Sequence, residues 1–319
     1  MSLPNPKAPM EMTEFPPLKV LFAARDELWP AWSSALRAAC PEAKLTRDGD
    51  PASFDAIVYA PGGEIEDLSP YRNARLVQSL WAGVERIVTN PTLTQPLARM
   101  VDPGLEQGMI DYCAGWVLRA HLGMDAYAQD GIWRNDTVPP LASERRVTVL
   151  GAGALGQAVA RALKGLGFDV ATWSASGRGA EGIPAFAGPE LDRALRRAEI
   201  LILLLPDTAA TRDLMNADRL SLLPQGATLI NPGRGTLIED AALLAALDRG
   251  HIRHAVLDVF RTEPLPPDHP FWAHPAVTVT PHIASETRVG TAAQVVAENL
   301  RRVMRGEAPR FLVDRAKGY

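Results

Sequence analysis

The chain has 319 residues, of which 47% are hydrophobic and 22% charged, and its formal net charge is −4. A chain of this length is too long for one compact unit, and its apolar content can fill two cores, so we expect two domains. The weakly acidic balance, without a long basic run, argues against a nucleic-acid partner. Every apolar run ends well short of about 18 residues, which argues against a membrane span.

Cysteine usage and the first residues bear on the compartment. Cys40 and Cys113 lie far apart in the sequence. This fits buried free thiols in a reducing compartment better than a disulfide framework or a metal site. The N-terminal residues lack the charged-then-apolar pattern of a signal peptide. We therefore expect a cytoplasmic protein without a bound metal.

The first part of the chain alternates short apolar runs with helical segments, as a small α/β domain does. The predicted strands are 18–24, 43–47, 56–60 and 76–80. A long helix is predicted over 106–128, with soft points at Gly115 and Gly123. This helix leads into the second half of the chain.

A glycine-rich turn joins an apolar strand to an amphipathic helix. The turn contains Gly151, Gly153, Ala154, Leu155 and Gly156. Gly151 permits a tight turn, Gly153 leaves the backbone open to a pyrophosphate, and Gly156 lets the helix pack closely on the strand. The N–H groups at the start of the helix can then bind phosphate oxygens. The pattern predicts a dinucleotide-binding turn, although small residues at this spacing also serve plain helix–strand packing.

From this turn onward, apolar runs alternate regularly with helices. The predicted strands are 147–150, 168–173, 200–205, 227–231, 253–259 and 277–280. Six strands in this alternation predict a doubly wound parallel sheet, with ligands at the carboxyl ends of the strands. A helix predicted over 287–305 and a short tail return the chain to the first domain.

Arg234 is the only charged residue in a turn of glycine and proline that follows the fourth of these strands. An arginine in such a turn can direct two N–H donors onto a carboxylate and hold it in one orientation. The alternative is an exposed arginine that pairs with a surface acid.

Glu263 follows the end of the predicted strand 253–259, and His282 follows the end of the predicted strand 277–280. A histidine there can give a proton to a carbonyl oxygen, while Glu263 holds the imidazole in one tautomer and raises its pKa. Alternatively, His282 is satisfied by the backbone and Glu263 is solvated in a proline-rich loop. Their occurrence at successive strand ends of one sheet favours the catalytic interpretation.

Together these segments resemble the D-isomer-specific 2-hydroxyacid dehydrogenases, which are NAD(P)-dependent enzymes with an Arg, Glu, His catalytic set. The resemblance covers nearly the whole chain, and the ending and spacing are most similar to the glyoxylate/hydroxypyruvate reductase A branch. The segments that carry it are 78–84, 151–156, 204–208, 231–235, 257–266 and 281–284.

The resemblance implies a fold, two domains and a catalytic set. We predict an α/β protein in which a Rossmann-type doubly wound parallel sheet is inserted in a second, smaller flavodoxin-like α/β domain. Residues 1–104, completed by 283–319, would form the substrate domain, and 105–282 the dinucleotide-binding domain. The implied catalytic residues are Arg234, which binds the substrate carboxylate and carbonyl, Glu263, which orients and charges the histidine, and His282, the general acid.

The substrate loop implied by the resemblance contains Trp81, Ala82 and Gly83. The N–H groups of Ala82 and Gly83 would bind the substrate carboxylate. Trp81 stands where many relatives carry a small residue, so its indole either narrows the pocket or packs in the core of the first domain.

Residues after the second strand bear on the choice of cofactor. Ser174 stands where NAD-preferring members carry an acid, and Ser176 and Arg178 can bind a 2′-phosphate. NADPH is therefore the preferred cofactor that we predict, with NAD use also open; alternatively, the loop is simply solvated. Family analogy adds Leu205, Pro206 and Asp258 as cofactor contacts, although Asp258 could equally just end its strand.

We therefore predict NAD(P)H-dependent reduction of glyoxylate to glycolate and of hydroxypyruvate to D-glycerate. The alternatives are another 2-keto acid, such as pyruvate or a bulkier analogue, and a non-catalytic nucleotide-sensing protein on the same fold. In the resembling family the helix 106–128 and the segment 131–143 form a two-fold contact, so we expect a homodimer.

Overall fold

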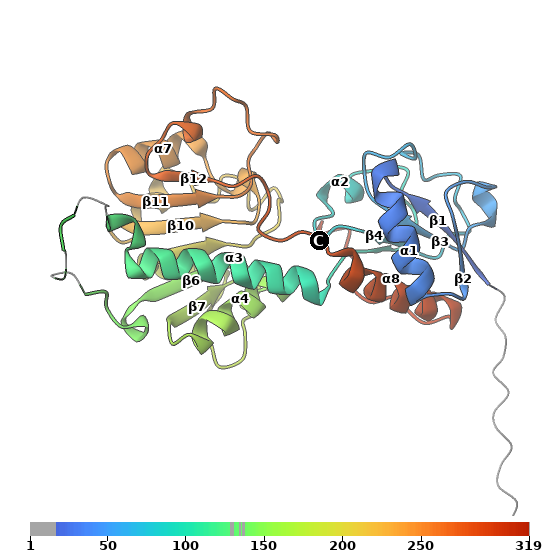
Figure 1. Cartoon of the computed structure of the whole chain (residues 1–319), viewed down its shortest axis with the longest axis horizontal. Helices are drawn as coiled ribbons and strands as arrows, with labels where there is room; N and C mark the ends of the chain where they lie inside the picture. Colours follow the sequence, from blue (N-terminus) through green and yellow to red (C-terminus); the bar gives the residue numbers. More distant parts are fainter. Residues whose placement is uncertain (1–16, 128–130, 134, 136–137, 319) are drawn as a thin grey trace, which may run out of the picture. The chain divides into compact units, whose positions relative to one another are not determined.

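The computed structural model describes residues 17–127, 131–133, 135 and 138–318. The chain divides into two compact units, both drawn in Figure 1. The smaller contains the described residues up to Trp81, then Arg86–Met100 and Ala293–Val313. The larger contains Ala82–Glu85, Val101–Ala292 and the described residues from Asp314 onward. In this division the chain returns to the smaller unit at Ala293, and the predicted domain bounds, 1–104 with 283–319 and 105–282, stay a prediction.

The smaller unit is built on a five-stranded parallel sheet with the order β2-β1-β3-β4-β5. Its strands are β1 (Leu18–Ala23), β2 (Ala43–Thr46), β3 (Ala56–Tyr59), β4 (Val77–Ser79) and β5 (Leu97–Ala98). Its helices are α1 (Trp29–Ala39), most of α2 (Glu85–Val88) and most of α8 (Val289–Met304). This strand order is the flavodoxin-like one, as predicted. Strand β5 was not predicted, because a strand of two residues is too short to show an alternation of apolar and polar side chains.

The larger unit contains a seven-stranded parallel sheet with the order β12-β11-β10-β9-β6-β7-β8. Its strands are β6 (Arg146–Leu150), β7 (Asp169–Trp173), β8 (Ala185–Phe186), β9 (Ile200–Leu203), β10 (Ala227–Asn231), β11 (Ile252–Leu257) and β12 (Val277–Val279). Its helices are α3 (Pro103–Leu122), α4 (Ala154–Gly165), α5 (Leu191–Arg196), α6 (Ala217–Ser221) and α7 (Asp240–Asp248). The order is that of a Rossmann-type doubly wound sheet, which confirms the predicted fold class.

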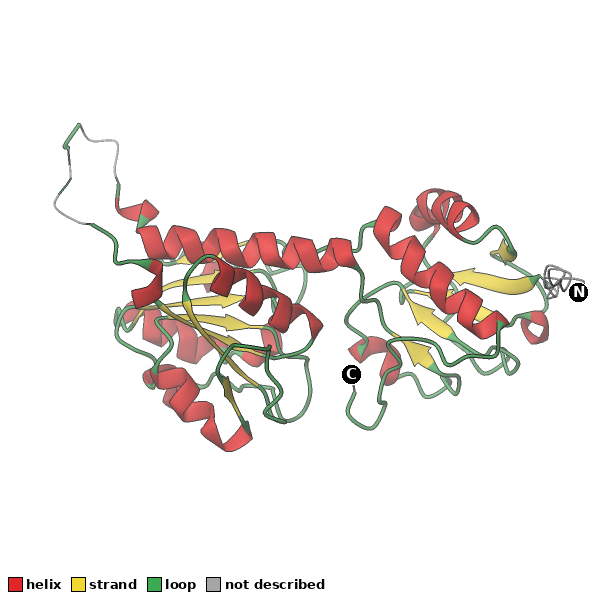
Figure 2. Cartoon of the chain, turned by 90° about the horizontal axis from the view of Figure 1, so that it is seen from below, coloured by secondary structure: helices red, strands yellow, loops and turns green. Residues whose placement is uncertain are grey.

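Apolar side chains cover both faces of the larger sheet. Along β9, Leu201 and Leu203 belong to one buried cluster, while Ile200 and Ile202 belong to another. The first cluster includes residues of α5, α6 and α7, and the second includes residues of α3 and α4. Figure 2 shows helices on both sides of these strands. Burial of both faces explains why the strands are continuous apolar runs instead of alternating ones.

Two predictions of the elements need correction. Six strands were predicted for the larger sheet, but the two-residue edge strand β8 is a seventh. The long helix starts at Pro103, because the Asp102 side chain accepts hydrogen bonds from two N–H groups of its first turn. It ends at Leu122, because Gly123 adopts the left-handed conformation with φ of 64°. Residue 128, the predicted end, lies outside the described residues.

Short 3₁₀ helices complete the described structure. They are Asp26–Leu28, Pro51–Ser53, Met124–Ala126, Ala142–Glu144, Gly188–Glu190, Gly235–Leu237 and Pro270–Trp272. In the described part of the chain, no helix combines the length and the apolar character that crossing a membrane requires.

The turn from β6 to α4 uses its three glycines differently. At Gly151, with φ of 110°, a Cβ atom would lie 2.3 Å from the carbonyl oxygen of Leu204. At Gly156 it would lie 1.8 Å from the carbonyl oxygen of Gly151. At Gly153 nothing lies within 4 Å of that position. Two of the glycines therefore allow close packing, and the third leaves open space beside the turn.

This difference predicts the effect of two alanine substitutions on stability. Gly156→Ala forces a methyl group against backbone, so we expect a loss of about 1–3 kcal/mol in the free energy of unfolding. Gly153→Ala, the matched control, meets no atom and loses less than about 1 kcal/mol through the helix cap. Denaturant unfolding measures both, and equal stability of the two variants would contradict the packing role of Gly156.

Candidate active site

The candidate site lies at the carboxyl ends of three neighbouring strands of the larger sheet. Asn231, Leu257 and Val279, at the ends of β10, β11 and β12, are linked in register: Asn231 pairs with Leu257, and Leu257 pairs with Val279. The three strands therefore end at the same level. The turns that follow them carry Arg234, Glu263 and His282, all within one unit.

Glu263 and His282 form an ion pair. The distance from Nδ1 of His282 to Oε2 of Glu263 is 2.7 Å. The other carboxylate oxygen of Glu263 accepts a hydrogen bond from the N–H of Phe260 at 2.8 Å. The side chain of His282 is 51% exposed, so the imidazole is tethered on one side and accessible on the other.

The contact favours the charged forms of both side chains, because it raises the pKa of His282 and lowers the pKa of Glu263. The hydrogen bond with Glu263 raises the pKa of His282, although burial acts against it. Burial alone would raise the pKa of Glu263, but the hydrogen bonds from His282 and Phe260, with the charge of His282, lower it overall. Because a protonated imidazole donates through both nitrogens, Nε2–H is left to donate to a bound molecule.

A buried carboxylate holds the turn that carries His282. Oδ1 of Asp258, a fully buried residue, accepts hydrogen bonds from Oγ1 of Thr280 at 2.6 Å and the N–H of Ile283 at 2.9 Å. Its Oδ2 accepts from the N–H of Ala284 at 2.9 Å. The backbone carbonyl of Asp258 accepts from the N–H of His282 at 2.8 Å. These bonds hold His282 in the left-handed region, with φ of 57°.

Tyr112 of α3 extends this network. Its hydroxyl lies 2.7 Å from Oγ1 of Thr280. Because the single hydroxyl proton of Thr280 goes to Asp258, Tyr112 must be the donor to Thr280. The sequence did not assign a role to Tyr112 or Thr280, since nothing in the chain order places residue 112 beside residue 280. That Asp258 contacts the cofactor stays a prediction.

Arg234 is held at the carboxyl end of β10 by its own turn and by Glu85. Asn231 donates from its side chain to the carbonyl of Arg234 at 2.9 Å and accepts from the N–H of Gly233 at 3.1 Å. Nε and Nη2 of Arg234 donate to the two oxygens of Glu85 at 3.0 and 3.2 Å, and Nη1 donates to the carbonyl of Gly233 at 2.6 Å. Glu85 was not among the predicted site residues.

The predicted carboxylate loop reaches Arg234 through Gly83. A Cβ atom at Gly83 would lie 1.9 Å from Nη2 of Arg234, so a larger residue there would displace the guanidinium. Ala82 and Gly83 are both partly exposed and belong to the same unit as Arg234. Trp81 belongs to the smaller unit, where its N–H donates to Oγ of Ser79 at 2.9 Å. The roles predicted for Trp81, Ala82 and Gly83 stay predictions.

The segment after β7 forms a small turn stabilised by its own polar groups. Oγ of Ser174 donates to the carbonyl of Arg178 at 2.7 Å, and the N–H of Arg178 donates to Oγ of Ser176 at 3.4 Å. Gly177 supplies the positive φ of 73° that the turn needs. The side chain of Arg178 is exposed. After β9, Leu205 is buried and Pro206 is partly buried.

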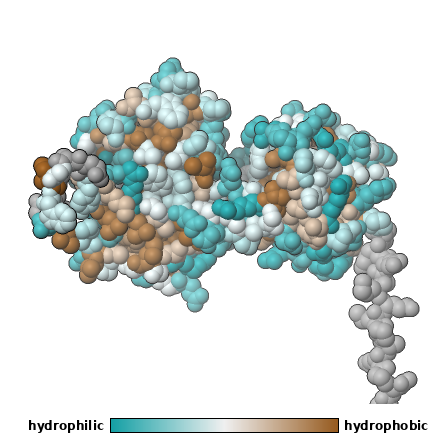
Figure 3. All heavy atoms as spheres, in the orientation of Figure 1, coloured by the Kyte–Doolittle hydropathy of each residue, from teal (hydrophilic) through white to brown (hydrophobic). Residues whose placement is uncertain are grey.

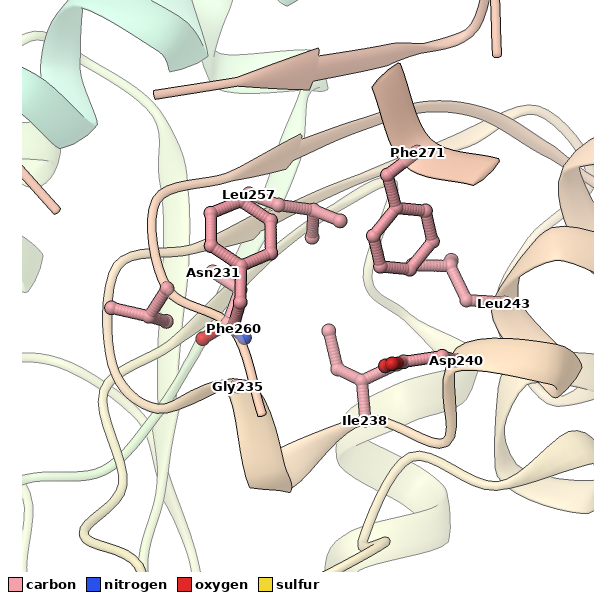
Figure 4. Close-up of a pocket in the computed structure, with 9 residues that line it drawn as sticks. Asn231, Gly235, Ile238, Asp240, Leu243, Leu257, Phe260 and Phe271 are labelled. Atoms are coloured by element: carbon pink, nitrogen blue, oxygen red, sulfur yellow. The ribbon is translucent and has the colours of Figure 1, made fainter. Parts of the chain in front are cut away.

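A small pocket lies behind the Arg234 turn, between the end of β10 and the start of α7. Figure 4 shows Phe260 and Phe271 on one side of it and Ile238 and Asp240 on the other. Its volume of about 10 Å³ holds at most one water molecule, so this pocket is not a substrate site. Among the described residues, no group of three or more His, Cys, Asp or Glu side chains could hold a metal ion.

Residues 116–284 match the family model for the NAD binding domain of D-isomer specific 2-hydroxyacid dehydrogenases. The chain belongs to this family. Glyoxylate/hydroxypyruvate reductase A of Salmonella paratyphi B is 36% identical over 90% of this chain and 96% of that protein. The resemblance to the dehydrogenases, and to this branch of them, is therefore confirmed.

Solved structures of other 2-hydroxyacid dehydrogenases share the fold. The structure from Xanthobacter autotrophicus Py2, in complex with NADPH and MES, has a TM-score of 0.88 at 38% identity and covers 95% of this chain and 99% of its own. An NADPH-dependent glyoxylate/hydroxypyruvate reductase from Sinorhizobium meliloti, in complex with NADP and sulfate, has a TM-score of 0.84 at 33% identity, with coverage of 95% and 99%.

Proposed function

We propose that this dehydrogenase is an NADPH-dependent reductase of small 2-keto acids that converts glyoxylate to glycolate and hydroxypyruvate to D-glycerate. The observation that carries the proposal is the contact between Nδ1 of His282 and the Glu263 carboxylate at 2.7 Å, which lies with Arg234 at one edge of the larger sheet. The names of the Salmonella and Sinorhizobium relatives support the same substrates.

The residues of the larger unit fit a dinucleotide. The open space at Gly153 and the N-terminus of α4 suit a pyrophosphate. The exposed Arg178 and the hydroxyl of Ser176 can donate to a 2′-phosphate, while Ser174, whose hydroxyl donates to the carbonyl of Arg178, shapes the turn and places no acid beside it. Leu205, Pro206 and Asp258 are the further contacts that we propose. Reduced nicotinamide, when bound, supplies the hydride that the carbonyl carbon of the substrate receives.

The protein's own residues supply the proton and the orientation. Arg234 holds the substrate carboxylate and its adjacent carbonyl, together with the N–H groups of Ala82 and Gly83. Nε2–H of His282 gives its proton to the keto oxygen as the carbon is reduced, which leaves a hydroxyl group and a neutral imidazole. Glu263 keeps the imidazole protonated and oriented through Nδ1–H until that step.

We assign the substrate-domain role to residues 1–104 with 283–319, and the dinucleotide-binding role to 105–282. Trp81 borders the substrate pocket in this proposal. One methylene more or less in a substrate changes its transition-state binding in an apolar pocket by only about 1–3 kcal/mol. Other 2-keto acids are therefore expected to react as well, at lower rates. A protein that only sensed nucleotides would not need the His282–Glu263 pair, which argues against that alternative.

The catalytic assignment predicts the activities of two variants. His282→Ala should lower kcat on the order of 10²–10⁴-fold with nearly unchanged NADPH binding. Arg234→Lys should weaken 2-keto acid use, because lysine lacks the planar fork. Absorbance of reduced nicotinamide with glyoxylate measures both. Wild-type turnover in the histidine variant, or full activity in the lysine variant, would contradict the assigned roles.

The turn after β7 predicts the cofactor preference. We expect kcat/KM to be higher for NADPH than for NADH, because a hydroxyl and a guanidinium can bind a 2′-phosphate. Ser174→Asp should reverse this order, since its charge repels the phosphate and accepts hydrogen bonds from a ribose 2′-hydroxyl. Ser174→Asn is the matched control for size without charge. Equal use of both cofactors by the unmodified enzyme would show that this turn does not discriminate.

We further propose that the enzyme is a cytoplasmic homodimer. Large apolar side chains are exposed around the end of α3 and after it, and Trp133 is 90% exposed. These residues are Leu122, Met124, Tyr127, Ile132, Trp133, Val138 and Leu141, and brown atoms mark this region at the left edge of Figure 3. A second copy of the chain can cover them.

Light scattering at micromolar concentration tests the dimer. We expect twice the 34.5 kDa of one chain. Trp133→Ser should shift the equilibrium toward the monomer, because it removes the largest of these exposed apolar side chains, whereas Trp272→Ser, an exposed tryptophan elsewhere in the unit, should not. A monomeric wild-type protein would refute the proposal.

A further inference from the structure

Glu85 is a charged residue beside the candidate site to which the proposed mechanism gives no role. Its two carboxylate oxygens accept hydrogen bonds from Nε and Nη2 of Arg234, at 3.0 and 3.2 Å. Ala82–Glu85 and Arg234 belong to the same compact unit. The contact is therefore a two-bond pair along one edge of the guanidinium, a geometry that fixes the plane of the group as well as its position.

The pair leaves a defined part of Arg234 for a ligand. A guanidinium has five N–H donors. Two donate to Glu85 and one, on Nη1, donates to the carbonyl of Gly233. Two N–H donors remain, one on each terminal nitrogen. A planar carboxylate can accept one hydrogen bond from each terminal nitrogen, which makes this the remaining two-donor edge.

The surroundings hold the pair in place. The side chains are only 31% and 24% exposed for Arg234 and Glu85, so solvent competes less than at a surface ion pair. The backbone of Gly83 packs against both, since a Cβ atom there would lie 1.9 Å from Nη2 of Arg234 and 2.8 Å from Oε2 of Glu85. The N–H of Asp207 lies 3.5 Å from Oε1 of Glu85 and adds a contact from the loop after β9.

We propose that Glu85 is a positioning residue for substrate binding, which rests on the function proposed above. By occupying the edge formed by Nε and Nη2, Glu85 confines the substrate carboxylate to the edge formed by Nη1 and Nη2. Glu85 also prevents the guanidinium from turning about the Nε–Cζ bond. One orientation of the carboxylate sets one orientation of the adjacent carbonyl, which must face His282.

Kinetics of three variants test this role. Glu85→Gln keeps the size but turns one acceptor into a donor that faces an N–H group of Arg234. We expect the KM for glyoxylate to rise about 10-fold or more, the KM for NADPH to stay unchanged, and kcat to fall less than the KM rises. Glu85→Asp, which keeps the charge, should recover part of the loss. Arg86→Gln, at the exposed neighbouring position, is the control and should behave as wild type.

A second readout does not depend on activity. Nuclear magnetic resonance of the Arg234 guanidinium, assigned with Arg234→Lys, should show slow rotation about Nε–Cζ in the wild type and fast rotation in Glu85→Gln. Thermal unfolding checks that the variants fold. An unchanged or lower KM for glyoxylate in Glu85→Gln, or unchanged rotation of Arg234, would overturn the positioning role. Absence of glyoxylate reduction by the wild type would instead refute the proposed function, and the rotation rates would still decide whether Glu85 orients Arg234.

Discussion

The arrangement of the site depends on one constraint, the burial of a parallel sheet on both faces. The strands of a parallel sheet all run in one direction, so their carboxyl ends meet at one edge, and the helices of the crossover connections cover both faces. In this protein the register brings the ends of β10, β11 and β12 to the same level. Arg234, Glu263 and His282 are far apart in the chain and come together because each follows one of these strand ends. Hydrophobic burial thus sets the positions from which polar contacts fix the side chains.

The polar contacts then act at shorter range. A fully buried carboxylate, that of Asp258, would be costly without partners, but two backbone N–H groups and the hydroxyl of Thr280 satisfy it. These bonds stabilise the left-handed backbone at His282, which aims the imidazole at Glu263. The site therefore has a rigid buried support beneath a half-exposed reactive group, an arrangement that suits proton transfer to a bound molecule.

Local patterns predicted most of the framework, and long-range contacts account for the rest. Strand β10 was predicted at its observed bounds, because its apolar run is bordered by turn residues. The glycine turn was predicted correctly, since the residues that define it, Gly151, Gly153 and Gly156, are close together in the sequence. Glu85 was missed because its partner, Arg234, lies 149 positions away in the chain, and no local sequence pattern indicates such a contact. The end of α3 was placed too late because helix propensity does not show when a glycine becomes a cap.

The Glu263 carboxylate raises the pKa of His282 and so favours the protonated imidazole, and titration of His282 by nuclear magnetic resonance measures this coupling. Because the folded pKa of His282 is raised, the pair contributes stability below the unfolded value of about 6.5 and loses it as pH rises through the folded pKa. Because the pKa of Glu263 is lowered, the same contribution is lost at acid pH, as Glu263 becomes protonated. We predict that Glu263→Gln lowers the pKa of His282 and that Glu286→Gln, which removes an exposed charge nearby, leaves it in place. An unchanged pKa of His282 in Glu263→Gln would show that Glu263 does not favour the protonated imidazole.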